Sequence, residues 1–563
     1  MKLKLWVTSL FTLGLLFSFV FSIILALAFF FNLISFWLMI IGTIFIHFVL
    51  WLVSPYISDW IYKWFYSTRF YTYEEISNHA YAKFLKKVCD EHNIKFPKIG
   101  IIKDQNPTAF TYGSASFNAR IILTEGLFTF LDERELEAVI AHEAGHIVNK
   151  DFIIMTIAST LLSLLYQFYV MFAKNRTSSD HEDKKDPLIF IGFVSLIFYY
   201  VGTYVLMFLS RTREYYADEF AVKQVKDPNF LSSALIKIAY GIAAVPDDEN
   251  TARILNSTRS MGIFDFKAAR DVGLIRENSK GQKGMLERAL SFDFISPWAI
   301  LLQLKSTHPL VGRRIKRLSS MTNSPIFDFS GILSMKIDKK RLWLNFLKDA
   351  SIKYIYIIII FFYIVYGLIV NVLIFSSLLK GGESVPLSQI LSAPLMLLVT
   401  VFYWLFVIAL CSAPILRTRY MYSKKNFEKA SVLDCMADIY ASPVRGKPIE
   451  MSGKAIGRAL PGFIFGEDMM FRDKSGIIYL NYESPIPVFG NLYFGWKKVE
   501  KLINEPASIK GWFVRGVTHH VELYRFNTTK STIKSYVRMR SIIGQYLLIV
   551  FVVFMLYMLY LAF

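Results

Sequence analysis

The sequence predicts a multi-span α-helical membrane protein with a mostly helical soluble domain, which has a small β edge, and a small β-barrel domain towards the C-terminus. The first observation is composition: of 563 residues, 54% are hydrophobic and 16% aromatic, while only 19% are charged. The second is that several apolar stretches are long enough to cross a bilayer. The third is that residues 440–527 contain short β-like runs separated by turn residues. Such a composition is not typical of a soluble globular chain.

The predicted membrane segments are apolar stretches of the roughly 20 residues needed to span a bilayer. They are Leu5–Phe30, Leu33–Val53, Phe152–Phe172, Leu188–Leu209, Ile355–Leu379, Leu391–Leu410 and Ile542–Ala562. The third and fourth contain more polar, Gly and Tyr residues than the others. A hairpin packed against the soluble domain is therefore the alternative for these two. The first stretch runs well past the length of a signal-peptide core and is expected to be an uncleaved anchor.

Charge next to these segments predicts the orientation of the chain. Lys2 and Lys4 precede the first segment, which puts the N-terminus inside by the positive-inside rule. Counting segments then places 56–151, 210–352 and 415–540 in the cytoplasm. The expected organisation is two transmembrane helices (1–55), the soluble domain in two parts (56–151 and 210–352) around a membrane hairpin (152–209), two further transmembrane helices (353–415), a β-rich domain (416–540) and a last transmembrane helix (541–563).

The net charge of +19 is interpreted as cytoplasmic Lys and Arg facing anionic lipid. The lipid bilayer is therefore the expected partner of this charge. Nucleic-acid binding is not expected, because no basic module interleaved with aromatic residues is present. The three cysteines are far apart in the sequence and predict neither a disulfide framework nor a thiolate metal site.

The segment Asp132–Asn149 is predicted to be a helix. Asp132 and Glu135 have the spacing of a capping box, and an apolar stripe at helical spacing follows them. Upstream of it, Tyr73–Glu91 is predicted to be an amphipathic helix. Two short β-like runs, Ile99–Ile102 and Ala119–Thr124, bracket a loop-rich stretch, Asp104–Phe117.

The helix after Asp132 carries the motif His142-Glu143-Ala144-Gly145-His146. Residues four apart lie on one helix face, so both imidazoles can reach one zinc ion. Glu143 lies beside them, where a carboxylate can accept a proton from the water that attacks a peptide bond. Gly145 is costly inside a helix, and a close approach by another element to the metal would explain it.

Two histidines leave a zinc site one protein ligand short. Glu214 is the best candidate, because it follows the fourth apolar segment and shares a helix face with Asp218, four residues later. Asp218 can then accept the outer N–H of a ligand histidine. An ordinary charged patch at the membrane boundary is the alternative, since Arg211 and Arg213 are close in sequence.

Several motifs together resemble one known family, the HtpX-like branch of the M48 membrane zinc metallopeptidases, which are related to the CaaX prenyl proteases. The matching residues are Ala141–His146, Ser210–Asp218, Thr124–Leu127, Asp132, Glu135-Leu136, Asp151, Thr307-His308-Pro309 and Arg314-Ile315. The resemblance covers roughly residues 70–320. It implies a gluzincin catalytic domain with Zn2+ on His142, His146 and Glu214, Glu143 as the base, and Asp218 as the partner of a ligand histidine. It also implies that His308 stabilises the oxyanion and that Arg314 braces the oxyanion or the helix of the third ligand; a surface loop and a solvated basic helix are the alternatives for these two.

A second stretch resembles the segment that pairs with extended substrate in this family. It consists of Thr108, Ala109, Phe110, Thr111, Tyr112 and Gly113, preceded by Pro107. An edge strand can hold a peptide of almost any sequence through main-chain hydrogen bonds. Thr108 stands where the family usually has Asn, so a side-chain amide is not available at this position. A plain surface loop is the alternative.

These expectations combine into a membrane-integral zinc endopeptidase that cleaves cytosolic segments of membrane proteins, plausibly damaged ones, as the resemblance implies. The site is expected on the cytoplasmic side of a bacterial or archaeal cell membrane. A CaaX-type prenyl-protein peptidase is the alternative within the enzymes, and a catalytically silent membrane scaffold or regulator is the alternative outside them. The sequence indicates no oligomeric state.

The C-terminal β-rich region weakly resembles the OB-like barrels attached to some membrane proteins. Its predicted strands are Ile449–Met451, Gly476–Tyr482, Val499–Leu502, Trp512–Val514 and Val521–Tyr524. The adjacent His519 and His520 have no evident third ligand and are interpreted as a strand end.

Overall fold

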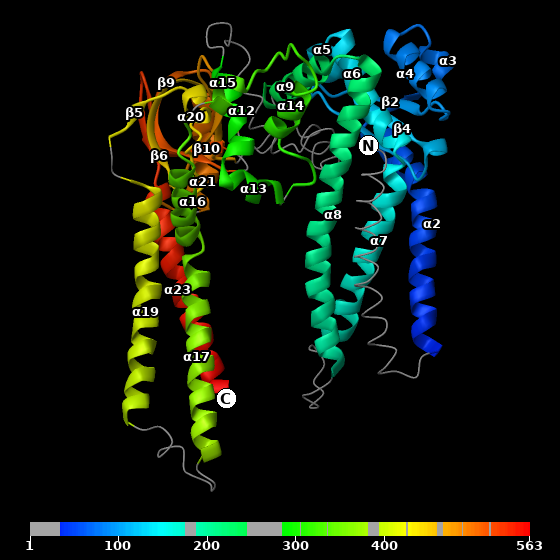
Figure 1. Cartoon of the computed structure of the whole chain (residues 1–563). Helices are drawn as coiled ribbons and strands as arrows, with labels where there is room; N and C mark the ends of the chain where they lie inside the picture. Colours follow the sequence, from blue (N-terminus) through cyan, green and yellow to red (C-terminus); the bar gives the residue numbers. More distant parts are fainter. Residues whose placement is uncertain are drawn as a thin grey trace. The chain divides into compact units, whose positions relative to one another are not determined.

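The computed structural model describes residues 34–174, 187–244, 284–304, 306–334, 336–380, 393–423, 426–458, 466–486, 488–516 and 519–562. The chain divides into two compact units, Met1–Met335 and Lys336–Phe563. Each unit is described by itself, with the element labels of Figure 1. The predicted segment Leu5–Phe30 lies outside the described residues.

The first unit contains a four-stranded sheet with the order β1-β2-β4-β3. Its strands are β1 (Arg69–Tyr71), β2 (Lys98–Ile102), β3 (Ala109–Tyr112) and β4 (Arg120–Thr124). β2 and β4 pair in parallel, and β3 pairs with β4 antiparallel. The isoleucines of β2 and β4 suit a buried sheet, and β4 is buried along its whole length. Among the described strands β3 is therefore an edge, and it lies within the stretch whose composition predicted loops.

The helices before and after the sheet follow the sequence pattern with one difference. The predicted helix Tyr73–Glu91 consists of α3 (Tyr73–Ile76) and α4 (Ala80–Glu91), separated by a short break. After α5 (Glu125–Phe130), α6 runs over Glu133–Val148. Its capping box is confirmed, because Glu135 N donates to Asp132 Oδ1 at 3.0 Å and Asp132 N donates to Glu135 Oε2 at 3.0 Å.

Three long helices of this unit lie side by side in Figure 1, namely α2 (Ile34–Phe65), α7 (Asp151–Tyr169) and α8 (Pro187–Val225). Two helical segments, Asp151–Ala173 and Leu188–Val225, are long and apolar enough to cross a membrane. The first of these segments extends into a π-helical end of α7, η2 (Val170–Lys174). Gly192 allows α8 to approach this end closely, because a Cβ there would lie 2.8 Å from the Cβ of Ala173. α8 continues without a break past the predicted membrane segment.

Five more helices belong to the described part of the first unit. They are α9 (Pro228–Ala244), α12 (Met285–Ile295), α13 (Pro297–Leu304), α14 (Val311–Ser319) and α15 (Ser330–Ser334). Three of them, α9, α13 and α14, contact α8. α14 contacts α8, α9 and α12. Its Arg314 is 1% exposed, so the alternative of a solvated basic helix is wrong for this residue.

The second unit joins three long helices to a β-barrel. The helices α17 (Ile355–Lys380), α19 (Ala393–Met421) and α23 (Val537–Ala562) follow a shorter one, α16 (Lys339–Lys353), which meets α17 at a bend of 73°. The segment Val401–Met421 of α19 is long and apolar enough to cross a membrane. Gln545 of α23 ties the bundle together: it accepts from the Tyr356 hydroxyl at 2.9 Å and donates to Thr418 Oγ1 at 3.5 Å.

The barrel is a closed ring of five strands. They are β6 (Lys447–Arg458), β7 (Met469–Arg472), β8 (Ile477–Asn481), β9 (Pro506–Arg515) and β10 (His519–Thr528). Neighbours pair in the order β6-β7-β8-β10-β9, and β9 closes the ring on β6. Only β8 and β10 pair in parallel within the ring. The short strands β5 (Glu428–Lys429) and β11 (Thr532–Lys534) extend it.

One predicted strand of this region is wrong. Val499–Leu502 is helical, at the end of a continuous helical run formed by α21 (Phe489–Phe494), η4 (Gly495–Val499) and α22 (Glu500–Leu502). Val499 and Leu502 are buried three residues apart, which is helical spacing. A stretch of four residues is too short for the spacing of its apolar residues to distinguish a helix from a strand. A true strand, β7, had no prediction.

Candidate metal centre

Two helices bring three metal-ligating side chains together. His142 and His146 come from α6, and Glu214 comes from α8. His142 Nε2 lies 3.6 Å from Glu214 Oε2, and His146 Nε2 lies 3.6 Å from Glu214 Oε1. One ligand atom from each residue lies within 4.8 Å of the other two. Residues about seventy positions apart in the sequence thus face one point.

Gly145 makes this approach of α6 and α8 possible. A Cβ at Gly145 would lie 3.2 Å from the Cα of Ala217 and 3.2 Å from the Phe220 ring, both on α8. The helix that carries the third ligand therefore packs directly against the glycine between the two histidines. This agrees with the reason predicted for a glycine inside the helix.

Each histidine has a carboxylate at its outer nitrogen. Asp218 Oδ1 lies 3.0 Å from His142 Nδ1, and Asp151 Oδ2 lies 2.6 Å from His146 Nδ1. Such partners favour the tautomer that leaves Nε2 free to bind a metal. Asp218 was predicted for this position. Asp151 was noted only as a family resemblance, because the left-handed turn at Lys150 (φ 57°) that brings it back to α6 has no clear sequence signal.

Both carboxylates are held by buried arginines. Arg314 of α14 donates to Asp218 through Nε at 2.9 Å and through Nη2 at 2.5 Å, and its Nη1 lies 3.6 Å from Glu214 Oε2. Arg213 contacts Asp151 through one atom only, Nη2, which also donates to Asn149 O at 3.3 Å. The second pair was not predicted from the sequence. A carboxylate that is paired in this way costs less to bury than an unpaired one.

Glu143 lies beside the ligands and is 1% exposed. Its Oε2 accepts a hydrogen bond of 2.5 Å from the hydroxyl of Thr111 on the edge strand β3. Burial raises the pKa of Glu143 above the usual carboxyl value, although the two histidines and Thr111 act against this. A carboxylate with a raised pKa accepts a proton readily and can give it up again.

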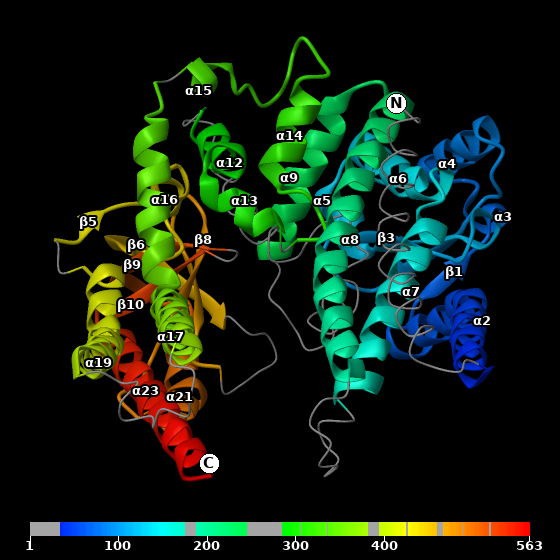
Figure 2. The ribbon, with the colours of Figure 1, turned by 60° about the horizontal axis from the view of Figure 1, so that its bottom comes forward.

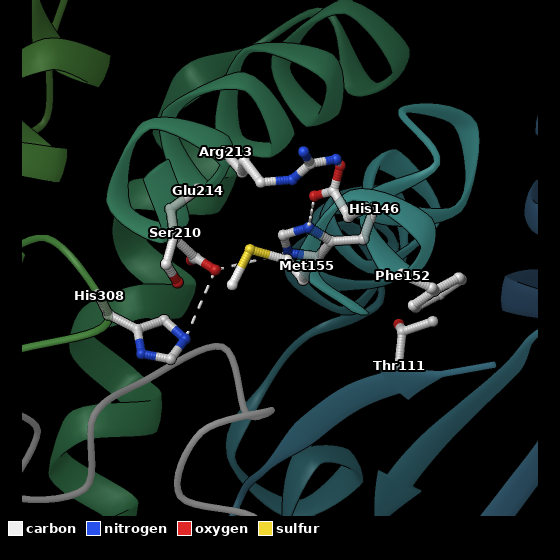
Figure 3. A pocket seen from close by; sticks show the side chains of 9 residues that line it. Thr111, His146, Phe152, Met155, Ser210, Arg213, Glu214 and His308 are labelled. Atoms are coloured by element: carbon white, nitrogen blue, oxygen red, sulfur yellow. Dashed lines mark hydrogen bonds and ion pairs between the residues drawn. The ribbon is translucent and has the colours of Figure 1, made fainter. Parts of the chain in front are cut away.

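Figure 3 shows the pocket in front of these groups. The pocket has a volume of about 180 Å³ and is lined by Thr111, His146, Asp151, Phe152, Met155, Ser210, Arg213, Glu214 and His308. His308 precedes α14 and is 4% exposed, and its Nε2 points towards Glu214 Oε1 at 3.4 Å. The alternative of an exposed surface loop is therefore wrong for His308. Phe152, Met155 and Ser210 belong to the two helices that can cross a membrane.

The structure brings the predicted substrate segment to the same place. Ala109–Tyr112 form β3, with Thr108 and Gly113 at its two ends. Thr108 N donates to Thr124 Oγ1 at 2.8 Å, and the Tyr112 hydroxyl donates to Asp59 of α2 at 2.7 Å. The segment is thus an ordered strand beside Glu143, and not a plain surface loop.

The donor set fits a zinc ion. His142 Nε2 and Glu214 Oε2 are buried and have no hydrogen-bond partner among the described residues. Two imidazoles and one carboxylate are a common protein ligand set for catalytic zinc. Burial acts to lower the pKa of His142, but the nearby carboxylates of Asp218 and Glu214 outweigh it and raise the pKa to about 9. In the metal-free protein this imidazole is therefore held as a cation, in the place that a metal cation would take.

Comparison with known proteins finds similar chains. The family model described as "Peptidase family M48" matches residues 76–322. A "Protease HtpX homolog" of Pyrococcus abyssi is 34% identical over 198 residues, which cover 35% of this chain and 68% of that protein. The "Protease HtpX homolog" of Methanothermobacter thermautotrophicus is 36% identical over 149 residues, 26% of this chain and 55% of that protein, so the chain spans about half the length of this relative. The crystal structure of S. mikatae Ste24p matches with a TM-score of 0.29 and 23% identity, over 42% of this chain and 59% of that chain.

Proposed function

The chain belongs to peptidase family M48, and from this premise we propose that it is a membrane-embedded, zinc-dependent endopeptidase. One observation carries the proposal: His142, His146 and Glu214 meet within 4.8 Å, and Glu143 lies beside them. A ligand set of this kind together with an adjacent base is what peptide hydrolysis by an activated water requires.

His142, His146 and Glu214 would hold the zinc ion in a gluzincin arrangement. When bound, zinc supplies a Lewis acid that polarises the scissile carbonyl and lowers the pKa of water. Asp218 and Asp151 hold the ligand histidines by their outer nitrogens. Arg314 touches Asp218 and Glu214, so it acts as a positioning residue that braces the third-ligand helix.

Glu143 is the proposed general base. Its carboxylate takes a proton from the attacking water and then delivers this proton to the leaving amine. Thr111 holds this carboxylate through one oxygen, Oε2, while Oε1 is buried without a hydrogen-bond partner among the described residues. His308 is the proposed oxyanion donor, because its Nε2 points into the pocket on the side of Glu214.

The proposed substrate is an extended polypeptide added to the free side of β3. Main-chain pairing with an edge strand selects for an extended shape and not for a sequence. The pocket is lined in part by α7 and α8, which suits cytosolic segments of membrane proteins that emerge next to these helices. We place the site on the cytoplasmic side of a bacterial or archaeal cell membrane, with the bilayer as the other partner. No nucleic-acid ligand is proposed.

For the barrel of the second unit we propose an OB-like fold. The support is its ring of five strands, in which a helical run joins β8 to β9. The barrel contains no second group of metal-ligating residues in the part that the structure describes. We propose that it serves in regulation, docking or oligomer contacts.

The decisive experiment compares Glu143→Gln with the wild-type chain in detergent or vesicles. The variant is expected to keep one zinc ion and to lose cleavage of casein by about 100-fold or more. Undiminished cleavage would remove Glu143 from its role. A wild-type chain that binds zinc but cleaves neither casein nor itself would favour the silent scaffold, and preferential cleavage of prenylated peptides would favour a CaaX-type peptidase.

A further inference from the structure

The helical run between β8 and β9 has two apolar sides, and only one of them is used by the barrel. Its inner side carries Phe494, Val499 and Leu502, all buried. The Phe494 ring stacks on Tyr482 at the end of β8, with centroids 3.7 Å apart. The outer side of the run is therefore not needed for its packing on the barrel.

The outer side presents aromatic rings to the surroundings. Phe489, Tyr493 and Trp496 follow one another at intervals of four and three residues, which places them on one helix face. They are 79%, 57% and 51% exposed, and the preceding Ile486 and Val488 are 63% and 59% exposed. We call Phe489, Tyr493 and Trp496 the aromatic face. A contiguous apolar surface of this kind marks an interaction site on a folded protein.

Hydrogen bonds fix the aromatic face at the start of a predicted membrane span. Asn491 of α21 donates to Glu483 Oε2 at 2.8 Å, and the same carboxylate pairs with Arg540 in the first turn of α23. Tyr536, just before α23, donates its N–H to Glu483 O at 2.8 Å. Figures 1 and 2 both show α21 next to α23.

The level of the bilayer surface follows from α23 itself. Arg540 is its last charged residue, and Ile543, three residues later, is 51% exposed. At about 1.5 Å per residue, this is about 5 Å along the helix. Leu547 and Val550, each 64% exposed, continue the apolar surface away from the barrel. The aromatic face therefore lies close to the depth at which α23 passes from polar to apolar surroundings.

The charges on the run suit a lipid surface. Lys497 Nζ lies 4.1 Å from the centroid of the Trp496 ring, and Lys498 and Lys501 are exposed beside it. These three lysines outnumber the single glutamate of the run, Glu500. Aromatic rings combined with lysines are typical of helices that lie in the headgroup region of a membrane.

We propose that the aromatic face inserts into the headgroup region of the bilayer that α19 and α23 cross. The contact adds a second attachment of the barrel to the membrane, besides the helices that enter it. The partner is the lipid surface itself, and neither a protein nor a second copy of the chain.

The test measures the depth of spin labels in the full chain. Cys411 is exposed and is first replaced by alanine, whereas Cys89 and Cys435 are buried. Labels are placed one at a time at Phe489→Cys, at Lys429→Cys on the exposed strand β5 as the aqueous control, and at Leu547→Cys as the lipid control. The chain is reconstituted in vesicles of equal parts phosphatidylcholine and phosphatidylglycerol. Collision rates with oxygen and with a water-soluble nickel chelate are then recorded by electron paramagnetic resonance.

The label at position 489 is expected to collide with oxygen more and with the nickel chelate several-fold less than the label at position 429. The additional exchange Trp496→Ser is expected to shift it towards the values of position 429. Nickel accessibility equal to that of position 429 would overturn the proposal. Protection from both reagents would overturn it too, because the cover would then be protein; dipolar broadening between labels would identify a second copy.

Discussion

The hydroxyl of Thr111 donates a hydrogen bond of 2.5 Å to Oε2 of Glu143. It joins the edge strand β3 to the helix that carries the proposed base. A hydrogen bond to a charged acceptor is short and is worth roughly 1.5–3 kcal/mol. Thr111 therefore holds the base in register with the strand that is proposed to hold the substrate.

Replacing Thr111 with valine keeps the shape of the side chain and removes the donor. We expect kcat to fall by about tenfold or more while KM changes little, because a weaker restraint on the base affects the chemical step most. Thr111→Ser is the matched control and should restore most of the activity. A valine variant that keeps its activity while the serine variant loses it would show that the methyl group, and not the hydrogen bond, is what matters.

Zinc binding is expected to release protons. Burial acts to lower the pKa of His142, but the nearby carboxylates of Asp218 and Glu214 raise it to about 9 in the metal-free protein. Below about pH 9 a zinc ion must displace this proton, so the apparent zinc affinity rises with pH and levels off above that value. Titration of the metal-free chain with zinc in a weakly buffered indicator solution measures the release.

The matched variant for this measurement is Asp218→Asn, which keeps the shape of the partner and removes its charge. The pKa of His142 should fall, and fewer protons should be released at pH 7 in this variant. Proton release that is identical in both chains would contradict the role of Asp218.

A larger side chain at Gly145 should separate the two ligand-bearing helices. A Cβ added at this position would lie 3.2 Å from Ala217 Cα, so Gly145→Ala requires a shift of only a few tenths of an ångström. The longer side chain of Gly145→Leu forces α8 away from α6. We expect the leucine variant to lose zinc and the alanine variant to keep it with reduced affinity. Bound zinc measured on purified chains, with circular dichroism to show intact helices, tests this. A leucine variant with normal zinc content would contradict the packing.

Removing the charge of Arg314 should leave Asp218 buried with His142 as its remaining partner. Arg314→Met is expected to destabilise the catalytic unit by about 3–5 kcal/mol, as the loss of one partner of a buried ion pair does. Arg314→Lys keeps the charge but loses the two-point contact with Asp218, and an intermediate effect is expected. Thermal unfolding with and without zinc measures both variants. A lysine variant as destabilised as the methionine variant would show that charge alone is not what Arg314 provides.

Sequence reasoning was most successful where local patterns decide the structure. The capping box at Asp132 and the two histidines one turn apart define α6 by themselves. The assignment of Glu214 as the third ligand depended on the family resemblance. Glu214 lies on a different helix from the two histidines, and no local sequence pattern shows that two helices meet. The partners Asp151 and Thr111 depend on a left-handed turn at Lys150 and on the position of β3 against α6, and both are tertiary features.

In the β-rich region the local pattern predicted the wrong type of element. Val499–Leu502 has the composition of a short strand, but its burial follows the helical period and its place is fixed by packing on the barrel. The break between α3 and α4 likewise interrupts a pattern that reads as continuous in the sequence. For Val499–Leu502, packing on the barrel overrides a weak local preference.

The unbroken course of α8 has a mechanical consequence. A single helix, Pro187–Val225, contains both an apolar stretch that can cross a membrane and the carboxylate of Glu214. A helix is stiff over this length, so Glu214 cannot shift relative to the apolar stretch of α8 unless α8 bends. The two imidazoles belong to a different helix, and the three ligands therefore stay in register only as long as the tilt of α8 is maintained by its packing on α6 and α7.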